Sequence, residues 1–206
     1  MFKVVVVGCG EIATRKYFPI LQSLGSRVRL VGVCDLNEDI VNQVAQRLGI
    51  PNAYTSVSDL LAEQHPDIVI VLTPPRAHAD VVTTALASGA HVLVEKPMAA
   101  NVADCDKMND AAIQHNRKLG VMHSQLYHPP LDQVRREITK GHYGRFLGMR
   151  IFLAVGRYNW ISEPDHWAHK LRGGAVGEAG PHNQTVRICR KERVVKTHGR
   201  DGKKSD

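Results

Sequence analysis

Three features of the sequence predict an α/β protein built on a doubly wound parallel sheet. Short apolar segments alternate with helical segments through residues 1–125, an order typical of parallel sheets with helices on both faces. A Gly-rich turn, Gly8-Cys9-Gly10, follows the first apolar segment. The second apolar segment ends at a carboxylate, Asp35.

Each expected strand is a short apolar run bounded by turn residues. Residues 4–7 are four consecutive valines, which is typical of a strand buried on both faces of a parallel sheet. Residues 67–72 form a similar run, and the Pro74-Pro75 pair ends it. The other expected strands, in chain order, are residues 28–34, 54–57, 91–94 and 119–124.

Segments with helical patterns lie between these strands. Asn101 is expected to cap the helix that runs to about residue 116, because its side chain can accept a hydrogen bond from the first turn. The other expected helices are residues 12–24, residues 39–48, a helical turn over residues 58–61, and residues 77–88. This order predicts a Rossmann-type doubly wound parallel sheet.

An incomplete α+β domain is expected over residues 126–206. Pro129-Pro130 marks the change of domain, and a helix over residues 131–140 should end at Gly141. Residues 145–155 alternate in polarity and predict one antiparallel strand. A single strand cannot form a sheet, and the sequence becomes basic from about residue 183. We therefore expect a truncated domain, with a frameshift near codon 183 as a hypothesis for its origin.

The Gly-rich turn has the residue types that a dinucleotide needs. Gly8 would allow the tight turn, Gly10 would let a diphosphate approach the main chain, and Ala13 would let the helix pack closely on the strand. N–H groups at the start of the helix, around Glu11 and Ile12, would face the phosphates. Such turns also occur where nothing binds, so this alternative stays open.

Asp35 lies where a carboxylate would accept hydrogen bonds from the ribose of a bound dinucleotide. It favours NAD over NADP, because a 2′-phosphate would meet a like charge. The alternative is that Asp35 is an N-cap or turn residue before the helix near Glu38.

Lys96 follows the strand at residues 91–94 within the sequence Glu95-Lys96-Pro97. Ligands of open α/β sheets bind at the carboxyl ends of the strands, so the ammonium group should face the cofactor crevice. There it could hold a substrate hydroxyl and help to remove its proton. The alternative is an exposed lysine that pairs with Glu95.

Four spaced motifs resemble those of the Gfo/Idh/MocA family, the glucose–fructose oxidoreductase and inositol dehydrogenase-like enzymes. They are Gly8-x-Gly10-x-x-Ala13, Thr73-Pro74-Pro75-x-x-His78, Glu95-Lys96-Pro97 and Gly173-Gly174-x-x-x-Glu178-x-x-x-His182. The resemblance implies a dinucleotide-binding domain over residues 1–125. It also implies oxidation of a sugar or cyclitol hydroxyl, or reduction of the ketone, with NAD or NADP.

The resemblance implies roles for individual residues of the first domain. Lys96 corresponds to the catalytic lysine of the family. Thr73, Pro74 and His78 fall in the loop that borders the cofactor near its nicotinamide side, and Glu95 adjoins it.

The resemblance also extends to the second domain. His182 matches the usual acid/base histidine, and Glu178 stands where an aspartate is more common. Their spacing would place both on one face of a helix, although a structural role for either stays open. Trp160 and Trp167 could line a sugar pocket or pack in a core.

Composition and charge limit the expected partners. The last 24 residues contain eight Lys or Arg and three Asp or Glu, which is most of the net charge of +7. Without interleaved aromatic residues this pattern indicates a solvated tail rather than a nucleic-acid surface. No apolar run approaches the roughly 18 residues needed to span a bilayer. His166 and His169 lack further ligands, so no metal is expected.

The four cysteines share no CxxC spacing and indicate reduced thiols in a cytoplasmic protein. The expected partner is a small sugar or polyol substrate, with a homo-oligomer formed through the C-terminal part. The alternative function is a non-catalytic NAD-binding module that lacks a complete substrate domain.

Overall fold

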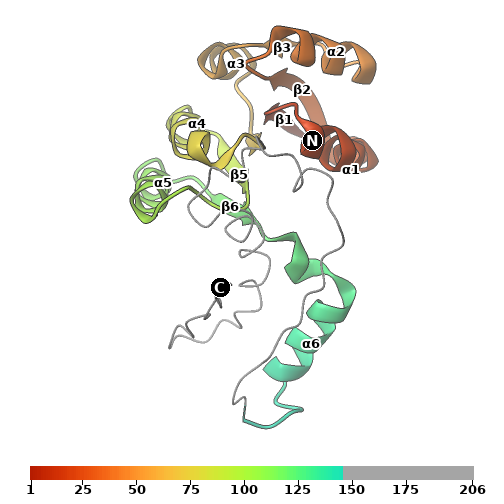
Figure 1. Ribbon diagram of the computed structural model, residues 1–206, viewed down its shortest axis with the longest axis vertical. Helices are drawn as coiled ribbons and strands as arrows, with labels where there is room; N and C mark the ends of the chain where they lie inside the picture. Colours follow the sequence, from red (N-terminus) through yellow and green to blue (C-terminus); the bar gives the residue numbers. More distant parts are fainter. Residues whose placement is uncertain (146–206) are drawn as a thin grey trace, which may run out of the picture.

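The computed structural model describes residues 1–145, which form a parallel six-stranded sheet with helices on both faces (Figure 1). The sheet order is β3-β2-β1-β4-β5-β6, and all neighbouring strands are parallel. The strands are β1 (Phe2–Val7), β2 (Val28–Cys34), β3 (Ala53–Tyr54), β4 (Ile68–Val71), β5 (His91–Glu95) and β6 (Leu119–Met122). This confirms the predicted doubly wound sheet.

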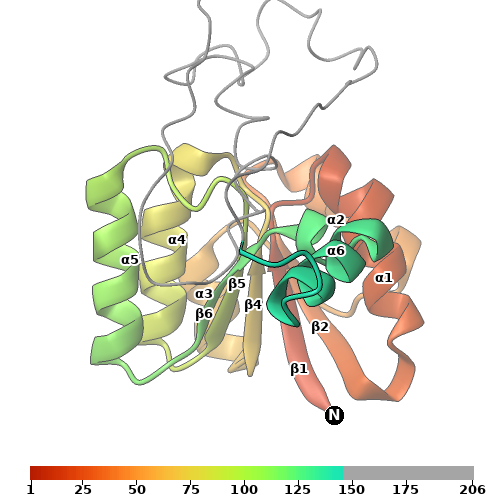
Figure 2. The same cartoon turned by 90° about the horizontal axis from the view of Figure 1, so that it is seen from below.

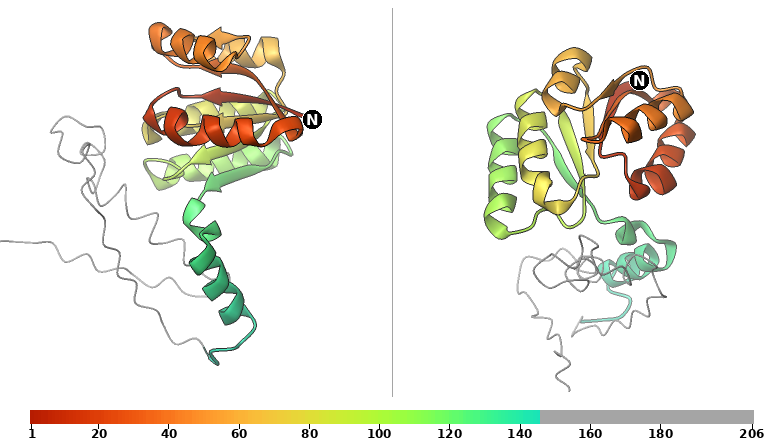
Figure 3. Two further views of the ribbon diagram at one scale, coloured as in Figure 1. Left: turned by 90° about the vertical axis from the view of Figure 1, so that its right-hand side faces the viewer. Right: turned by 45° about the horizontal axis from the view of Figure 1, so that its top comes forward.

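The helices are assigned to faces by the side chains that they bury. They are α1 (Phe18–Ser23), α2 (Glu38–Leu48), α3 (Val57–Gln64), α4 (Pro75–Ala87), α5 (Val102–Gln114) and α6 (Pro129–Thr139), with short helical turns η1 (Ala13–Tyr17), η2 (Gly25–Arg27) and η3 (Ser124–Tyr127). Figure 2 shows α3, α4 and α5 on one side of the sheet and α1 and α2 on the other. Helix α6 extends away from the sheet after β6 (Figure 3).

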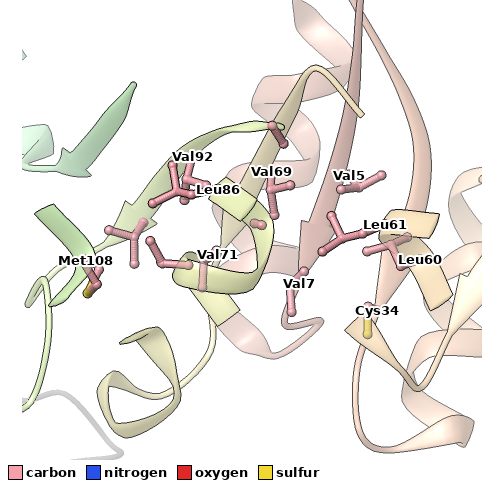
Figure 4. Packing of buried hydrophobic residues seen from close by; sticks show 14 of the residues in the cluster. Val5, Val7, Cys34, Leu60, Leu61, Val69, Val71, Leu86, Val92 and Met108 are labelled. Atoms are coloured by element: carbon pink, nitrogen blue, oxygen red, sulfur yellow. The ribbon is translucent and has the colours of Figure 1, made fainter. Parts of the chain in front are cut away.

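The four valines of β1 explain why both faces are covered. Side chains of a strand alternate between faces, so Val5 and Val7 join one core cluster while Val4 and Val6 join the other. In Figure 4 the first cluster lies between the strands and the helices α3, α4 and α5. Its labelled members are Val5, Val7, Cys34, Leu60, Leu61, Val69, Val71, Leu86, Val92 and Met108. A continuous apolar run is therefore what this central strand requires.

Polar side chains cap the start of three helices. Asn37, Ser56 and Asn101 accept hydrogen bonds from main-chain N–H groups in the first turns of α2, α3 and α5, at 3.1, 3.3 and 2.9 Å. Each bond satisfies a donor that the helix itself leaves unpaired. The predicted cap at Asn101 is confirmed.

Several predicted boundaries differ from the structure. The strand expected at residues 54–57 ends at Tyr54, because Ser56 caps α3 and Val57 is the first residue of that helix. The strand expected to reach residue 124 ends at Met122, and the helices expected at 77 and 131 begin at Pro75 and Pro129. A proline is tolerated there because the first turn of a helix needs no main-chain donor.

The predictions for the C-terminal part fall mostly outside the described residues. This applies to the strand at residues 145–155 beyond Arg145, to the basic tail, and to Trp160, Trp167, His166, His169, Glu178 and His182. The predicted domain boundary after Gln125 falls within η3. Among the helices of residues 1–145, none has both the length and the apolar character needed to cross a membrane.

Two apolar side chains of neighbouring helices should contribute differently to the free energy of unfolding. Leu86 of α4 is fully buried, whereas Ile113 of α5 is 78% exposed. We expect Leu86→Ala to lower the free energy of unfolding by about 2–5 kcal/mol, because it leaves a cavity. Ile113→Ala should change it by less than about 0.5 kcal/mol. Urea unfolding followed by circular dichroism measures both, and equal losses would contradict the assigned core.

Candidate active site

The predicted site residues of the first domain meet at one edge of the sheet. Gly8, Asp35, Thr73 and Lys96 follow the ends of β1, β2, β4 and β5, and the carboxyl ends of parallel strands lie at the same edge. The order of strands reverses between β1 and β4, since β2 lies on one side of β1 and β4 on the other. Such a reversal is where open α/β sheets bind ligands.

Gly8 and Gly10 serve different purposes in the turn after β1. Gly8 has a φ of +101°, and a Cβ at this position would lie 2.7 Å from the carbonyl carbon of Leu72 and 2.9 Å from the nitrogen of Thr73. No other residue type fits there. A Cβ on Gly10 would meet no described atom within 4 Å. The fold therefore requires the first glycine, and the second leaves space at the surface of the turn.

The residues after the turn divide between core and surface. Ala13 is fully buried and belongs to the core cluster of Val4 and Val6, which brings the first helix close to β1. Ile12 is 42% exposed, and Glu11 forms an exposed ion pair with Arg15 at 2.6 Å. Ala13 has the packing role expected of it, whereas Glu11 and Ile12 lie at the rim of the turn.

Asp35 is bonded to the Gly-rich turn itself. Its Oδ2 accepts a hydrogen bond from the N–H of Cys9 at 2.8 Å, and its Oδ1 accepts one from the N–H of Asn37 at 3.0 Å. Asn37, not Asp35, is the N-cap of α2. Each carboxylate oxygen can accept a second hydrogen bond, so the side chain keeps capacity for hydroxyl donors beside the turn.

Lys96 is half-buried at the end of β5, whereas the alternative expected an exposed lysine. Burial is the main cause that lowers its pKa below the ordinary value for a lysine. The negative charge of Glu95 acts in the opposite direction, and the nearby Lys16 lowers the pKa further. The Lys96–Pro97 peptide bond is cis.

Glu95 is 8% exposed and holds two groups at once. Its Oε1 accepts a hydrogen bond from the hydroxyl of Tyr17, and its Oε2 accepts one from the main-chain N–H of Lys96, both at 2.5 Å. A buried carboxylate is tolerated when both oxygens are bonded in this way.

His78 lies behind the loop in which it was expected to meet a cofactor. The ring is fully buried. Its Nε2 lies 2.7 Å from the carbonyl oxygen of Thr73, and its Nδ1 lies 3.1 Å from the carbonyl oxygens of Pro97 and Met98. Burial lowers the pKa of His78, and these carbonyl contacts partly oppose that effect. The histidine thus joins the loop after β4 to the loop after β5.

Thr73 lies between His78 and the Gly-rich turn, and Pro74 follows it. Pro74 is exposed at the N-cap position of α4. The Oγ1 of Thr73 is buried and has no hydrogen-bond partner among the described residues. Buried hydroxyls are normally paired, so this oxygen is a hydrogen-bonding group that the described residues leave unsatisfied.

Sequence reasoning missed four residues at this edge. Tyr17 and Lys16 end the π-helical turn η1, and His123 and Ser124 follow β6. The Nζ of Lys16 lies 3.4 Å from the Oγ of Ser124. His123 could have been found by the rule that located Lys96, since it also follows a strand of the sheet. No local pattern in the sequence marks Tyr17.

His123 resembles Thr73 in having an unsatisfied polar atom. Its Nδ1 is buried without a hydrogen-bond partner in the part of the chain that the structure describes. Burial lowers the pKa of His123, and the charge of Glu95 opposes this. Burial thus favours the neutral form of the ring.

Comparison with known proteins identifies the family. The profile of the GFO_IDH_MocA family, described as "Oxidoreductase family, NAD-binding Rossmann fold", matches residues 2–123. The chain belongs to this family. The predicted family, the predicted fold and NAD as the type of cofactor are thereby confirmed.

Individual members are similar over part of their length. The chain is 29% identical to 1-carboxy-3-chloro-3,4-dihydroxycyclohexa-1,5-diene dehydrogenase of Comamonas testosteroni, covering 82% of this chain and 43% of that protein. It is 30% identical to D-glucoside 3-dehydrogenase of Escherichia coli, covering 69% of this chain and 40% of that protein. The chain thus spans about half the length of the curated relatives it matches.

A solved structure shows the same likeness. The WlbA dehydrogenase of Chromobacterium violaceum, in complex with NADH and UDP-GlcNAcA, is 30% identical with a TM-score of 0.67. The match covers 70% of this chain and 41% of that protein. The roles of individual site residues in the present chain stay predictions.

Substitution of Gly8 should affect stability, whereas substitution of Gly10 should affect NADH binding. Gly8→Ala should lower the free energy of unfolding by about 2–4 kcal/mol, because the new Cβ overlaps the main chain of Leu72 and Thr73, directly after β4. Gly10→Ala should change stability by less than about 0.5 kcal/mol but weaken NADH binding about tenfold, because the methyl group fills the space for the diphosphate. Thermal unfolding and fluorescence titration with NADH measure these effects. Normal NADH affinity in folded Gly10→Ala protein would contradict the assignment.

Proposed function

We propose that this chain binds NAD at the reversal between β1 and β4 and uses Lys96 in hydride transfer at a CH–OH carbon of a sugar or cyclitol. The observation that carries the proposal is a half-buried lysine at the end of β5, at the same edge of the sheet as the Gly-rich turn. Relatives named D-glucoside 3-dehydrogenase and myo-inositol 2-dehydrogenase support the substrate class.

The residues present fit a dinucleotide. Space lies over Gly10, and the first helix begins there, so its unpaired N–H groups and positive dipole end suit a diphosphate. Asp35 keeps acceptor capacity for ribose hydroxyls. The unpaired hydroxyl of Thr73 supports a contact on the other side of the turn. A carboxylate at position 35 disfavours the 2′-phosphate of NADP.

NAD, when bound, supplies the hydride acceptor. Lys96 is suited to hold the substrate hydroxyl and to move its proton, because a lowered pKa increases the fraction of neutral amine near neutral pH. Glu95 holds the main chain of Lys96 at the end of β5. From the motif resemblance, we further propose His182 as the acid/base residue and Glu178 as its carboxylate neighbour.

The proposed ribose contact predicts a change in cofactor preference. Asp35→Ser should weaken NADH binding by about 10- to 100-fold, because ribose loses its acceptors. The affinity for NADPH should fall less, because like-charge repulsion is also lost. Asp39→Asn, an exposed change in the first turn of α2, is the matched control. Calorimetric titration with both nucleotides measures the ratio, and an unchanged ratio would refute the contact.

The proposed role of Lys96 predicts that its substitution lowers the rate of the reaction without weakening NADH binding. Lys96→Ala should lower kcat for polyol oxidation at least about 100-fold, because general acid–base assistance is lost, while the Kd of NADH changes less than about threefold. In the wild type, oxidation should accelerate as pH rises through the lowered pKa of Lys96, because only the neutral amine accepts a proton.

Turnover is measured with a panel of sugars and cyclitols by the increase in NADH absorbance, at a series of pH values. Lys107→Ala removes an exposed lysine of α5 that pairs with Asp80 and serves as control. Equal turnover in the wild type and Lys96→Ala would exclude the catalytic role. NADH binding without turnover of any polyol would instead favour the non-catalytic binding module.

A further inference from the structure

We propose that Tyr17 is a positioning residue for Lys96 that acts through the carboxylate of Glu95. The hydroxyl of Tyr17 donates to Oε1 of Glu95, and the other oxygen of that carboxylate accepts from the main-chain N–H of Lys96, each at 2.5 Å. Tyr17 lies 78 positions before Glu95. One buried carboxylate thus connects the first helix of the fold to the residue at the end of β5.

The conformation of the first helix presents Tyr17 to the sheet. Residues Ala13–Tyr17 form a π-helical turn before α1, and such turns are rare and frequent at functional sites. Ala13, Tyr17 and the following Phe18 are all buried, with Tyr17 at 7% exposure. A π-helical turn changes the rotation of side chains relative to an α-helix, so Tyr17 and Phe18 both face inward and the hydroxyl reaches β5.

Tyr17 is chemically suited to hold Glu95 at all ordinary pH values. Burial and the hydrogen bond to Glu95 raise the pKa of Tyr17 strongly, so the phenol keeps its proton and remains a donor. Glu95 and His78 are the buried polar or charged side chains among the described residues. Both hold the segment around Lys96, since His78 contacts the carbonyl groups of Pro97 and Met98.

Other charged and titratable groups near Glu95 decide what happens if the phenol is removed. Among residues 1–145 these are Lys16 beside Tyr17, Lys96 itself, His78 of α4 and His123 after β6. Without its tyrosine donor, Oε1 of Glu95 loses a hydrogen bond at a site that water scarcely reaches. The carboxylate then has one donor fewer to share its negative charge. Its attraction to the ammonium group of Lys96, which already raises the pKa of that lysine, becomes stronger and stabilises the charged form.

Titration of Lys96 tests this in the full chain without any turnover. With 13C-labelled lysine, the Cε resonance of Lys96 is assigned by its absence in Lys96→Arg and followed against pH. We expect the titration midpoint in Tyr17→Phe to rise by about 0.5–1 pH unit. Tyr54→Phe is the matched control. It also removes a tyrosine hydroxyl, but one that donates to Glu63, at 2.8 Å, and not to Glu95. An unchanged midpoint in Tyr17→Phe would overturn the proposal.

A second variant covers the case in which Tyr17→Phe does not fold, which thermal unfolding detects. Glu95→Gln removes the negative charge and should lower the titration midpoint of Lys96 by about 0.5–1 pH unit. This shift is opposite in direction to the one expected for Tyr17→Phe. If the titration midpoint of Lys96 were the same in Glu95→Gln and in the wild type, the proposal would also be overturned.

The effect on turnover rests on the proposed function. In a chain that oxidises a polyol, Tyr17→Phe should lower kcat about tenfold with the KM for NAD within about twofold. Absence of turnover in the wild type would refute the proposed function, while the titration would still decide the role of Tyr17. A changed titration with unchanged kcat would refute a positioning role in the reaction.

Discussion

The close approach of the first turn to the end of β4 is the constraint on which the rest of the site depends. Gly8 packs against the main chain of Leu72 and Thr73, where a Cβ does not fit. The N–H of Gly8 donates to the carbonyl of Cys34 at 2.8 Å, and the N–H of Leu72 donates to that of Val7 at 2.7 Å. The turn is therefore bonded to the strands on both sides of β1, at the point where the strand order reverses. Because these are main-chain contacts, they hold whatever side chains line the crevice.

Buried polar side chains form a second layer behind this turn. His78 joins the loops after β4 and β5, and Glu95 joins the first helix to Lys96. Burying such groups is costly unless they are hydrogen-bonded, and both are bonded to groups from other parts of the chain. The contacts that make their burial tolerable also fix the position of the loop that carries Lys96. Stability and the orientation of the proposed catalytic lysine thus depend on the same interactions.

The family relationship and the site geometry concern the same part of the chain. The family profile ends at residue 123, and the described sheet ends at Met122. Both limits lie close to residue 125, the predicted end of the dinucleotide-binding unit. The residues proposed for substrate chemistry are divided, because Lys96 belongs to this unit whereas Glu178 and His182 lie beyond the described residues.

The sequence by itself determined the order of strands and helices, the glycine at the tight turn and the positions of Asp35 and Lys96 at strand ends. These follow from local patterns, because side-chain period, turn residues and chain direction are properties of short segments. Tertiary structure alone decided that His78 lies behind its loop and that Tyr17 reaches Glu95. It also decided that Asp35 bonds the Gly-rich turn rather than capping α2. Those contacts join residues far apart in the chain. The direction of Tyr17 is set by a π-helical turn that the sequence pattern did not predict.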